Sequence, residues 1–467
     1  MKKLIGAILF VLMTLTVSGC VNNLDKDAIE YTLSDDETYY ILSYVGENIE
    51  ELVIPEYYNG KPVLEIGNNA FCYRVHPTSY NKSKIKNVQV EAKLTKIGKS
   101  AFRECSLLET INIPQTVTEI GAGAFEECKS LKSIEIPTGV TQINNSLFFE
   151  CEDLKSISLH NGIVKIDSFA FFGCKSIIEI TLPERIESIG KSAFSMMESL
   201  EKIKIVEENR GFASIDGVLY SKDQKTLIQY PPKKAGDSYA IPKEVETISE
   251  YAFAGNSIIK SISIPNSVNK IHSYAFYKCA ALEDINIPTE VKTLSMRVFE
   301  GCTSLKELVL HNKITKIDYG AFIRCSALEK MQIPESVTEI GGYAFAECSS
   351  LKEINLPSGL KELPYAVFED CTSLETITIP NGIKKIDFNT FLNCTSLKSV
   401  YIPSSVTEIN RGAFGVCTSL SDIFFDGSML RWKLIDGLYG VLGNKKDDWC
   451  YGSNNFVVHC TDGDIRQ

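Results

Sequence analysis

The segment AFEECKSLKSIEIPTGVTQINNS, residues 124–146, decides the fold because its pattern recurs through most of the chain. A second copy, AFAECSSLKEINLPSGLKELPY, occupies residues 344–365. A fixed period of this length predicts a solenoid in which each repeat buries its apolar face against its neighbours. One phenylalanine marks each copy, at steps of 23 residues in two runs, at Phe102, Phe125, Phe148, Phe171 and Phe194 and then at Phe253, Phe276, Phe299, Phe322, Phe345, Phe368, Phe391 and Phe414.

Each repeat predicts a turn-like segment followed by a short strand. Phe125 and Leu131 have helical spacing, which predicts one or two turns of α- or 3₁₀-helix. Residues 133–136 alternate in polarity and are expected to form a strand that Pro137 ends, because proline lacks an N–H group. A second apolar pair precedes a position that is mostly Gly, Asn or Asp, residue types that tolerate left-handed backbone. We therefore predict a right-handed curved solenoid of short parallel strands.

The repeat also sets the expected organisation of the chain. The step from Phe194 to Phe253 is longer than two repeats, and residues 218–228 within it resemble a β-hairpin. Both ends of the array need caps. The predicted segments are a lipoprotein-type signal peptide at 1–19, a tether at 20–30, an N-terminal cap and first repeat at 31–66, a first array at 67–205, a hairpin insert at 206–237, a second array at 238–423 and a C-terminal cap at 424–467.

The N-terminus predicts export. Lys2 and Lys3 precede an apolar run over residues 4–17, which is too short for an ordinary membrane span. Ser18-Gly19-Cys20 follows the run, and the whole segment resembles a bacterial lipoprotein signal. This resemblance implies lipidation of Cys20 and anchoring to a membrane. Plain secretion with an unmodified Cys20 is the alternative.

The charge balance argues against a nucleic-acid partner. The formal net charge is −11, and it becomes −13 without the two signal lysines. Binding to phosphate backbones depends on a basic surface, which this composition does not supply.

Most of the fifteen cysteines occupy one position of the repeat. Side chains stacked in parallel do not converge as a disulfide requires, so we expect small buried hydrophobic residues. Outside this row, Cys450 and Cys460 are candidates for a disulfide. The row consists of Cys105, Cys128, Cys151, Cys174, Cys279, Cys302, Cys325, Cys348, Cys371, Cys394 and Cys417.

No sequence motif indicates catalysis. The chain lacks HExxH, GxSxG, a P-loop and a glycine-rich dinucleotide loop, so we expect neither an enzyme nor a cofactor. His459-Cys460 is the one adjacent His-Cys pair, and we interpret it as the end of a capping strand. Zinc binding by this pair with Cys450 matches no usual spacing, so no metal site is predicted.

A binding surface is the better candidate. In each strand, the residue between the two inward-pointing apolar residues should face outward. Exposed Tyr401 and Phe424 would be suitable interface anchors, unless they pack beneath the C-terminal cap against Trp432. This outward row consists of Asn112, Glu135, Ser158, Thr181, Lys204, Ser263, Asn286, Val309, Gln332, Asn355, Thr378, Tyr401 and Phe424.

The repeat AFxxCxxLxxIxIPxxVxxIG resembles that of BspA-like leucine-rich repeat surface proteins. The segments IPEYYNGKPVLEIGNNAF, SIDGVLYSKDQKTLIQYPP and NNFVVHCTDGDI also resemble flanking elements of that family. The resemblance implies display on a bacterial surface and adhesion to host matrix proteins or to other cells. Two other hypotheses stay open: capture of glycans by Tyr401, Phe424 and Trp432, and a structural envelope component that associates with itself.

Overall fold

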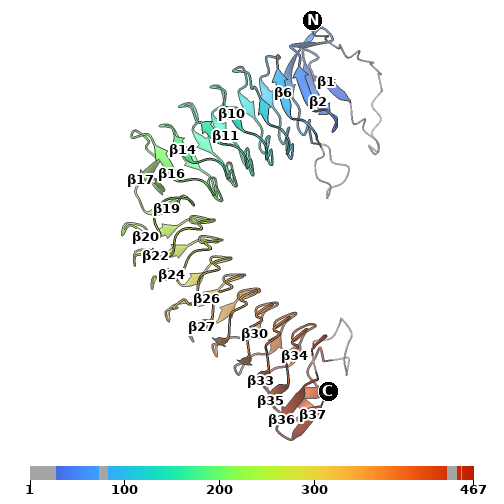
Figure 1. Ribbon diagram of the computed structural model, residues 1–467, viewed down its shortest axis with the longest axis vertical. Coiled ribbons are helices and arrows are strands. Elements are labelled where there is room, and N and C mark those ends of the chain that lie inside the picture. Colours follow the sequence, from blue (N-terminus) through green and yellow to red (C-terminus); the bar gives the residue numbers. More distant parts are fainter. Residues whose placement is uncertain (1–27, 73–82, 439–449, 454, 467) are drawn as a thin grey trace.

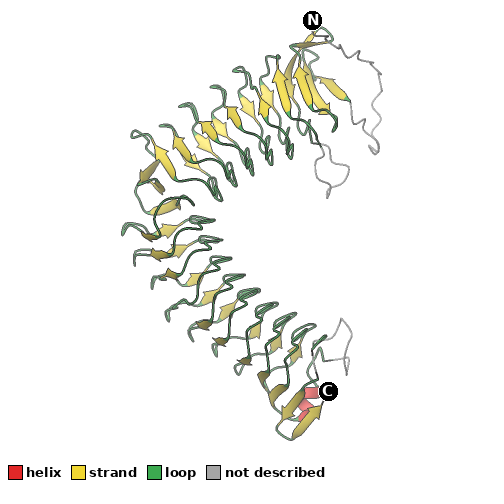
Figure 2. Cartoon of the chain, viewed as in Figure 1, coloured by secondary structure: helices red, strands yellow, loops and turns green. Residues whose placement is uncertain are grey.

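The protein is a long C-shaped solenoid in which the repeats follow one another from the N-terminal to the C-terminal end (Figure 1). The computed structural model describes residues 28–72, 83–438, 450–453 and 455–466. Short strands and turns make up almost the whole described chain, and one short helix lies near the C-terminal end (Figure 2). The predicted stack of short parallel strands is confirmed.

Almost every regular repeat contributes one strand to each of two ladders; the repeat that contains Val309 contributes a strand to the second ladder alone. In the first ladder, residues one repeat apart pair in parallel, as Ile134 does with Ile157. The ladder is formed by β3 (Glu51–Ile54), β6 (Asn87–Val90), β8 (Thr110–Ile111), β10 (Ser133–Glu135), β12 (Ser156–Ser158), β14 (Glu179–Leu182), β16 (Lys202–Ile205), β20 (Ser238–Ala240), β22 (Ser261–Ser263), β24 (Asp284–Ile285), β27 (Lys330–Gln332), β29 (Glu353–Asn355), β31 (Thr376–Thr378), β33 (Ser399–Pro403) and β35 (Asp422–Asp426).

The second ladder has the same parallel register, with Ile143 opposite Ile166. Its strands are β5 (Lys61–Ile66), β7 (Lys96–Ile97), β9 (Glu119–Ile120), β11 (Gln142–Ile143), β13 (Lys165–Ile166), β15 (Ser188–Ile189), β21 (Thr247–Ile248), β23 (Lys270–Ile271), β25 (Thr293–Leu294), β26 (Lys316–Ile317), β28 (Glu339–Ile340), β30 (Glu362–Leu363), β32 (Lys385–Ile386) and β34 (Glu408–Ile409).

The Ala-Phe segments form hydrogen-bonded turns, so the predicted short helices are wrong. Cys128 N donates to Phe125 O at 3.1 Å, but Phe125 N donates to Leu147 O in the next repeat at 3.1 Å. Glu127, between them, has a φ of 58°. A left-handed residue interrupts helical propagation, and the freed N–H groups bond to the next repeat instead.

The predicted left-handed position is also displaced. Gly341 occupies the Gly/Asn/Asp position, but the positive φ of 56° belongs to Tyr343, two residues later. A Cβ on Gly341 would lie 2.4 Å from the backbone nitrogen of Tyr319 in the preceding repeat. Glycine at this position therefore serves the close approach of neighbouring turns rather than a left-handed conformation.

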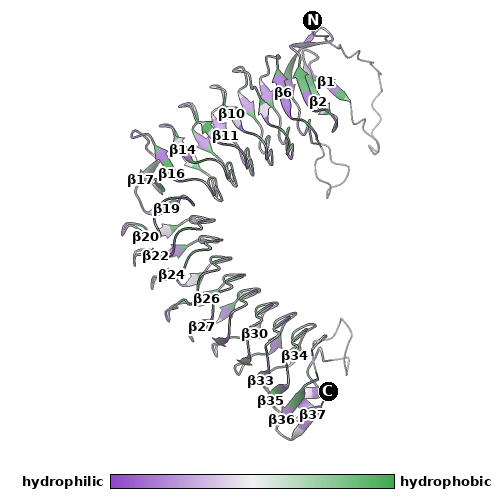
Figure 3. Cartoon of the chain, viewed as in Figure 1, coloured by the Kyte–Doolittle hydropathy of each residue, from purple (hydrophilic) through white to green (hydrophobic). Residues whose placement is uncertain are grey.

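The core is a column of aromatic rings and thiols between the two ladders. The marker phenylalanines are buried and stack within each of their two runs, with ring centroids 5.2–5.9 Å apart in adjacent repeats. In the cysteine row, the Sγ of Cys128 lies 3.1 Å from the carbonyl oxygen of Phe102. The cysteines of this row are buried thiols, as predicted. Burial raises the pKa of Cys417 to about 12. In Figure 3, hydrophobic and hydrophilic residues are interleaved throughout the stack, because every repeat contributes both buried core residues and exposed surface residues.

The insert between the two arrays is an antiparallel meander of β17 (Phe212–Ile215), β18 (Val218–Ser221) and β19 (Thr226–Gln229). The predicted hairpin is its β18–β19 part. Strand β19 then pairs in parallel with β21, so the meander joins the second ladder. The buried core divides at this point into two clusters, with Leu219 on one side and Val218 on the other.

Antiparallel strands begin and end the solenoid. At the N-terminal end, β1 (Ile29–Leu33) pairs with β2 (Tyr40–Val45), and β4 (Tyr57–Tyr58) pairs with β5. Strand β1 thus begins two residues inside the segment predicted as a tether. At the C-terminal end, α1 (Met429–Lys433) precedes β36 (Val457–Cys460) and β37 (Gly463–Arg466). Strand β36 pairs in parallel with β35 and antiparallel with β37.

Candidate binding face

The outward row occupies the predicted face of the first ladder. Glu135, for example, is exposed between Ile134 and Ile136, which are 7% and 3% exposed. Within the row, Asn355 and Phe424 are half-buried and the other residues are exposed. Val309 is 82% exposed, in a repeat that has no strand in this ladder. The alternation of strand side chains therefore gave the correct orientation.

Three asparagines of this row bind the backbone of the preceding repeat. Asn355 accepts from Ile333 N at 2.8 Å through Oδ1 and donates from Nδ2 to Ile333 O at 2.9 Å. Asn112 and Asn286 form the same pair of bonds with Val90 and Ile264. The side-chain amide supplies one more ladder pair, at the point where the main chain turns away toward a proline. These three residues have a structural role.

The aromatic members of the row form a stack at the C-terminal end. The rings of Tyr401 and Phe424 lie 4.7 Å apart with an interplanar angle of 13°. His459 of β36 continues the stack, 4.9 Å from Phe424 at 18°. We call Tyr401, Phe424 and His459 the aromatic ladder.

Hydrogen bonds to two carboxylates orient the imidazole of His459. Its Nε2 lies 2.8 Å from Asp422 Oδ1 and its Nδ1 lies 3.0 Å from Asp464 Oδ1. The bond to Asp422, followed by that to Asp464, raises the pKa of His459 above its ordinary value despite some desolvation. The charged imidazolium is therefore favoured, and it holds β36 against both of its neighbouring strands.

Sequence reasoning placed His459 at the end of a capping strand but missed its position in the row. The spacing from Phe424 to His459 is not one repeat, so the period gives no signal there. The register of β36 against β35, with His459 opposite Phe424, creates the relation. The alternation in Val457-Val458-His459-Cys460 was the available clue to an outward histidine.

Trp432 lies elsewhere and takes no part in the aromatic ladder. It is 4% exposed in α1, and its ring packs edge-on against Phe425 at 5.2 Å and 67°. Phe425 is the inward neighbour of Phe424 in β35. The alternative in which Tyr401 and Phe424 pack under the cap against Trp432 is therefore wrong, and the three aromatic residues considered for glycan stacking are not assembled on one surface.

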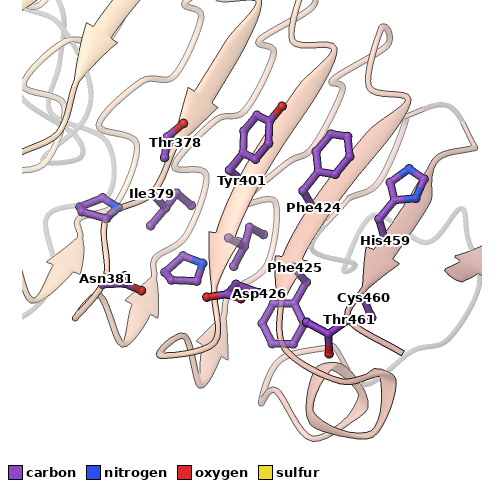
Figure 4. A pocket seen from close by; sticks show the side chains of 13 residues that line it. Thr378, Ile379, Asn381, Tyr401, Phe424, Phe425, Asp426, His459, Cys460 and Thr461 are labelled. Atoms are coloured by element: carbon purple, nitrogen blue, oxygen red, sulfur yellow. The ribbon is translucent and has the colours of Figure 1, made fainter. Parts of the chain in front are cut away.

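A shallow groove of about 550 Å³ runs beside the aromatic ladder (Figure 4). Its lining comes from β31, β33, β35 and β36 and from the turns that follow them. Two residues beyond each ladder position, a second row crosses the same strands, in which Asp426 and Thr461 are exposed, Pro380 is half-buried and Pro403 is buried. That second row consists of Pro380, Pro403, Asp426 and Thr461.

Two further histidines and the two cysteines proposed as a disulfide have structural surroundings. Nε2 of His160 and His311 lies 3.0 and 2.9 Å from the carbonyl oxygens of Pro137 and Pro288, so both imidazoles connect adjacent repeats. Cys450 and Cys460 are half-buried thiols rather than a disulfide.

The described part of the chain contains neither a candidate metal cluster nor a membrane-spanning helix. Residues 28–72, 83–438, 450–453 and 455–466 contain no cluster of three or more His, Cys, Asp or Glu side chains suited to a metal ion. Within the same ranges, no helix has the length and apolarity to cross a bilayer. The predicted signal peptide and the predicted lipidation site, Cys20, lie outside the described residues.

Solved bacterial repeat proteins resemble this chain. A leucine rich cell surface protein from Faecalibacterium prausnitzii is 28% identical, over 89% of this chain and 97% of that chain, with a TM-score of 0.45. A leucine-rich repeat protein from Bacteroides ovatus is 27% identical, over 89% and 97%, with a TM-score of 0.47. The pneumococcal vaccine antigen PcpA is 20% identical, over 94% and 98%, with a TM-score of 0.53, and shares the fold.

The family comparison covers most of the chain. No curated protein matches it. The family model described as BspA type leucine rich repeat region, in 6 copies, matches residues 42–151, 65–201, 234–340 and 315–433. The stacked strands, the buried phenylalanine column and this match together show that the chain belongs to the BspA-type leucine-rich repeat family.

Proposed function

We propose that this protein is exported, displayed at the bacterial cell surface and active in adhesion, and that it binds a protein of the host matrix or of another cell. The observation that carries the proposal is the aromatic ladder, because Tyr401 is 44% exposed at the rim of a groove. Exposed tyrosine and phenylalanine supply large, rigid contact area and are typical of interface anchors.

The position of the ladder on the solenoid supports this proposal. Tyr401, Phe424 and His459 lie on three adjacent strands whose backbones are fixed by hydrogen bonds. A partner would therefore meet an ordered surface, and little conformational entropy would be lost on binding. Attachment through a lipid on Cys20 would hold the exported protein at a membrane.

Binding assays with single-residue variants test the proposal. The full chain is immobilised on a biosensor and exposed to host matrix proteins and glycans. We expect a matrix protein to bind at micromolar strength or better, and Tyr401→Ala to weaken it by about tenfold or more, as for an interface anchor. Val309→Ser, on the same face but far along the array, is the matched control and should leave the affinity unchanged.

Three results would contradict the proposal. Binding that Tyr401→Ala does not affect would locate recognition elsewhere on the solenoid. Binding of glycans alone would favour the carbohydrate alternative, and concentration-dependent sedimentation without any ligand would favour self-association.

For the anchor, we expect Cys20→Ser to move the protein from the membrane fraction to the soluble fraction of the cell. An unchanged distribution would refute lipidation at this residue.

A further inference from the structure

Among the residues that line the groove beside the aromatic ladder, Asp426 is acidic and His459 is basic. Asp426 is exposed in the second row, and among the described residues no ion pair or side-chain hydrogen bond involves its carboxylate. None of the groove-lining residues is a lysine or an arginine. The other nearby carboxylates, Asp422 and Asp464, are bonded to His459, and this group of three carries a net charge of −1 even with the imidazole protonated. Asp426 is therefore the carboxylate in the groove that is available to a cationic side chain.

Another wall of the groove is aromatic and apolar. One face of the Tyr401 ring stacks on Phe424, and its other face is directed along the ladder toward Thr378, a much smaller side chain (Figure 4). Pro403 lies next to Asp426 in the second row. Pro403 is buried, so the exposed apolar surface of this wall is the Tyr401 ring. The edge of an aromatic ring accommodates the methylene stem of a long side chain, and an exposed aromatic face attracts its cationic head.

The dimensions of the groove suit an extended peptide. Its lining crosses four adjacent strands, which at a strand spacing of about 4.8 Å gives a length of roughly 14 Å. An extended chain spans about 3.3 Å per residue, so about four residues fit along the groove. Thr378, Asn381 and Thr461 place hydroxyl and amide groups along it that can bond to a peptide backbone.

We propose that this groove binds an extended segment of the partner that carries an arginine or lysine, with the cationic head on Asp426 and the aliphatic stem against Tyr401. This inference rests on the proposed function, since it names the chemistry of the partner at the same site. Charge complementarity of this kind gives specificity and faster association. Arginine suits the site better than lysine, because its planar guanidinium bonds to a carboxylate through two N–H groups.

A pair of isosteric peptides tests the inference. The probe is a blocked, biotinylated octapeptide of alternating glycine and arginine, and its neutral counterpart carries citrulline in place of arginine. Binding of the full chain to each immobilised peptide is measured at low salt and at 0.5 M salt. We expect the arginine peptide to bind at least tenfold more tightly than the citrulline peptide, and Asp426→Asn to abolish this difference. The matched control, Glu135→Gln, removes an exposed carboxylate from the same face far from the groove and should change nothing.

The remaining outcomes separate this inference from the proposed function. Equal binding of both peptides, or an arginine preference that survives in Asp426→Asn, overturns the cationic inference. If Tyr401→Ala still weakens the binding of a matrix protein in that case, the proposed function stands without it. If Tyr401→Ala affects neither peptide nor matrix protein, both proposals fail. Thermal unfolding of each variant is measured alongside, so that a loss of binding is attributed to the site only where the fold is intact.

Discussion

The asparagine bonds predict that part of the outward row stabilises the fold rather than binding a ligand. Asn355→Ala removes two hydrogen bonds, of 2.8 and 2.9 Å, to the backbone N–H and C=O of Ile333. A neutral hydrogen bond contributes about 1 kcal/mol net, so the variant should lose about 2 kcal/mol of unfolding free energy. Gln332→Ala is the matched control, because Gln332 is exposed directly opposite Asn355 in β27, and surface changes of this kind stay within about 0.5 kcal/mol.

Urea unfolding followed by circular dichroism measures the effect, and amide hydrogen exchange locates it. We expect a lower unfolding midpoint for Asn355→Ala than for Gln332→Ala, together with faster exchange at the Ile333 amide. Equal midpoints with an unchanged Ile333 exchange rate would refute the structural role of Asn355. If the variant kept its stability but lost binding to a matrix protein, the asparagines would belong to the binding surface.

Three further predictions follow from the packing. Gly341→Ala should destabilise the protein by about 1–3 kcal/mol in urea unfolding, because the new Cβ would lie 2.4 Å from a backbone nitrogen. Gly359→Ala is the control and should be near neutral, since its nearest contact would be a methyl group at 3.3 Å. Equal effects of the two substitutions would contradict the role of close approach. The buried cysteine row should resist alkylation at pH 8 in the native protein and react fully in urea, as counted by mass spectrometry, and native labelling of the row would show that it is accessible. His459→Gln should lower the unfolding midpoint more at pH 6 than at pH 9. The pKa of His459 is raised in the folded state, so the stability it contributes is present below the pKa of the unfolded chain and is lost as the pH rises through the pKa of the folded protein. The effect should be under about 1 kcal/mol at this exposed site, and an effect that does not depend on pH would refute the ion-pair role.

The repeat could be predicted almost completely from the sequence, and the reason is physical. A unit of this length cannot bury its apolar face alone, so the period itself requires stacking. The strand before Pro137 and the outward position of Glu135 follow from local alternation and from the missing proline N–H. The turns were less predictable. Their N–H groups bond to the next repeat, as Phe125 N does to Leu147 O, and spacing within one repeat does not encode those bonds.

The candidate site could be predicted only in part. Tyr401 and Phe424 follow from the period, because they are one repeat apart in the same row. His459 does not, because its place depends on how β36 returns to pair with β35 after the period has ended. The separation of Trp432 from the other aromatic residues likewise depends on the inward direction of Phe425, against which it packs.

By itself, the sequence determined the solenoid, the buried phenylalanine and cysteine columns and the face on which the outward row lies, because these depend on contacts that repeat identically along the chain. The tertiary structure alone decided which members of that row bind their own backbone, that His459 completes the aromatic ladder, and that the carboxylate of Asp426 lies in the groove beside it. These features arise where non-repeating segments meet the array, and a periodic pattern carries no information about such contacts.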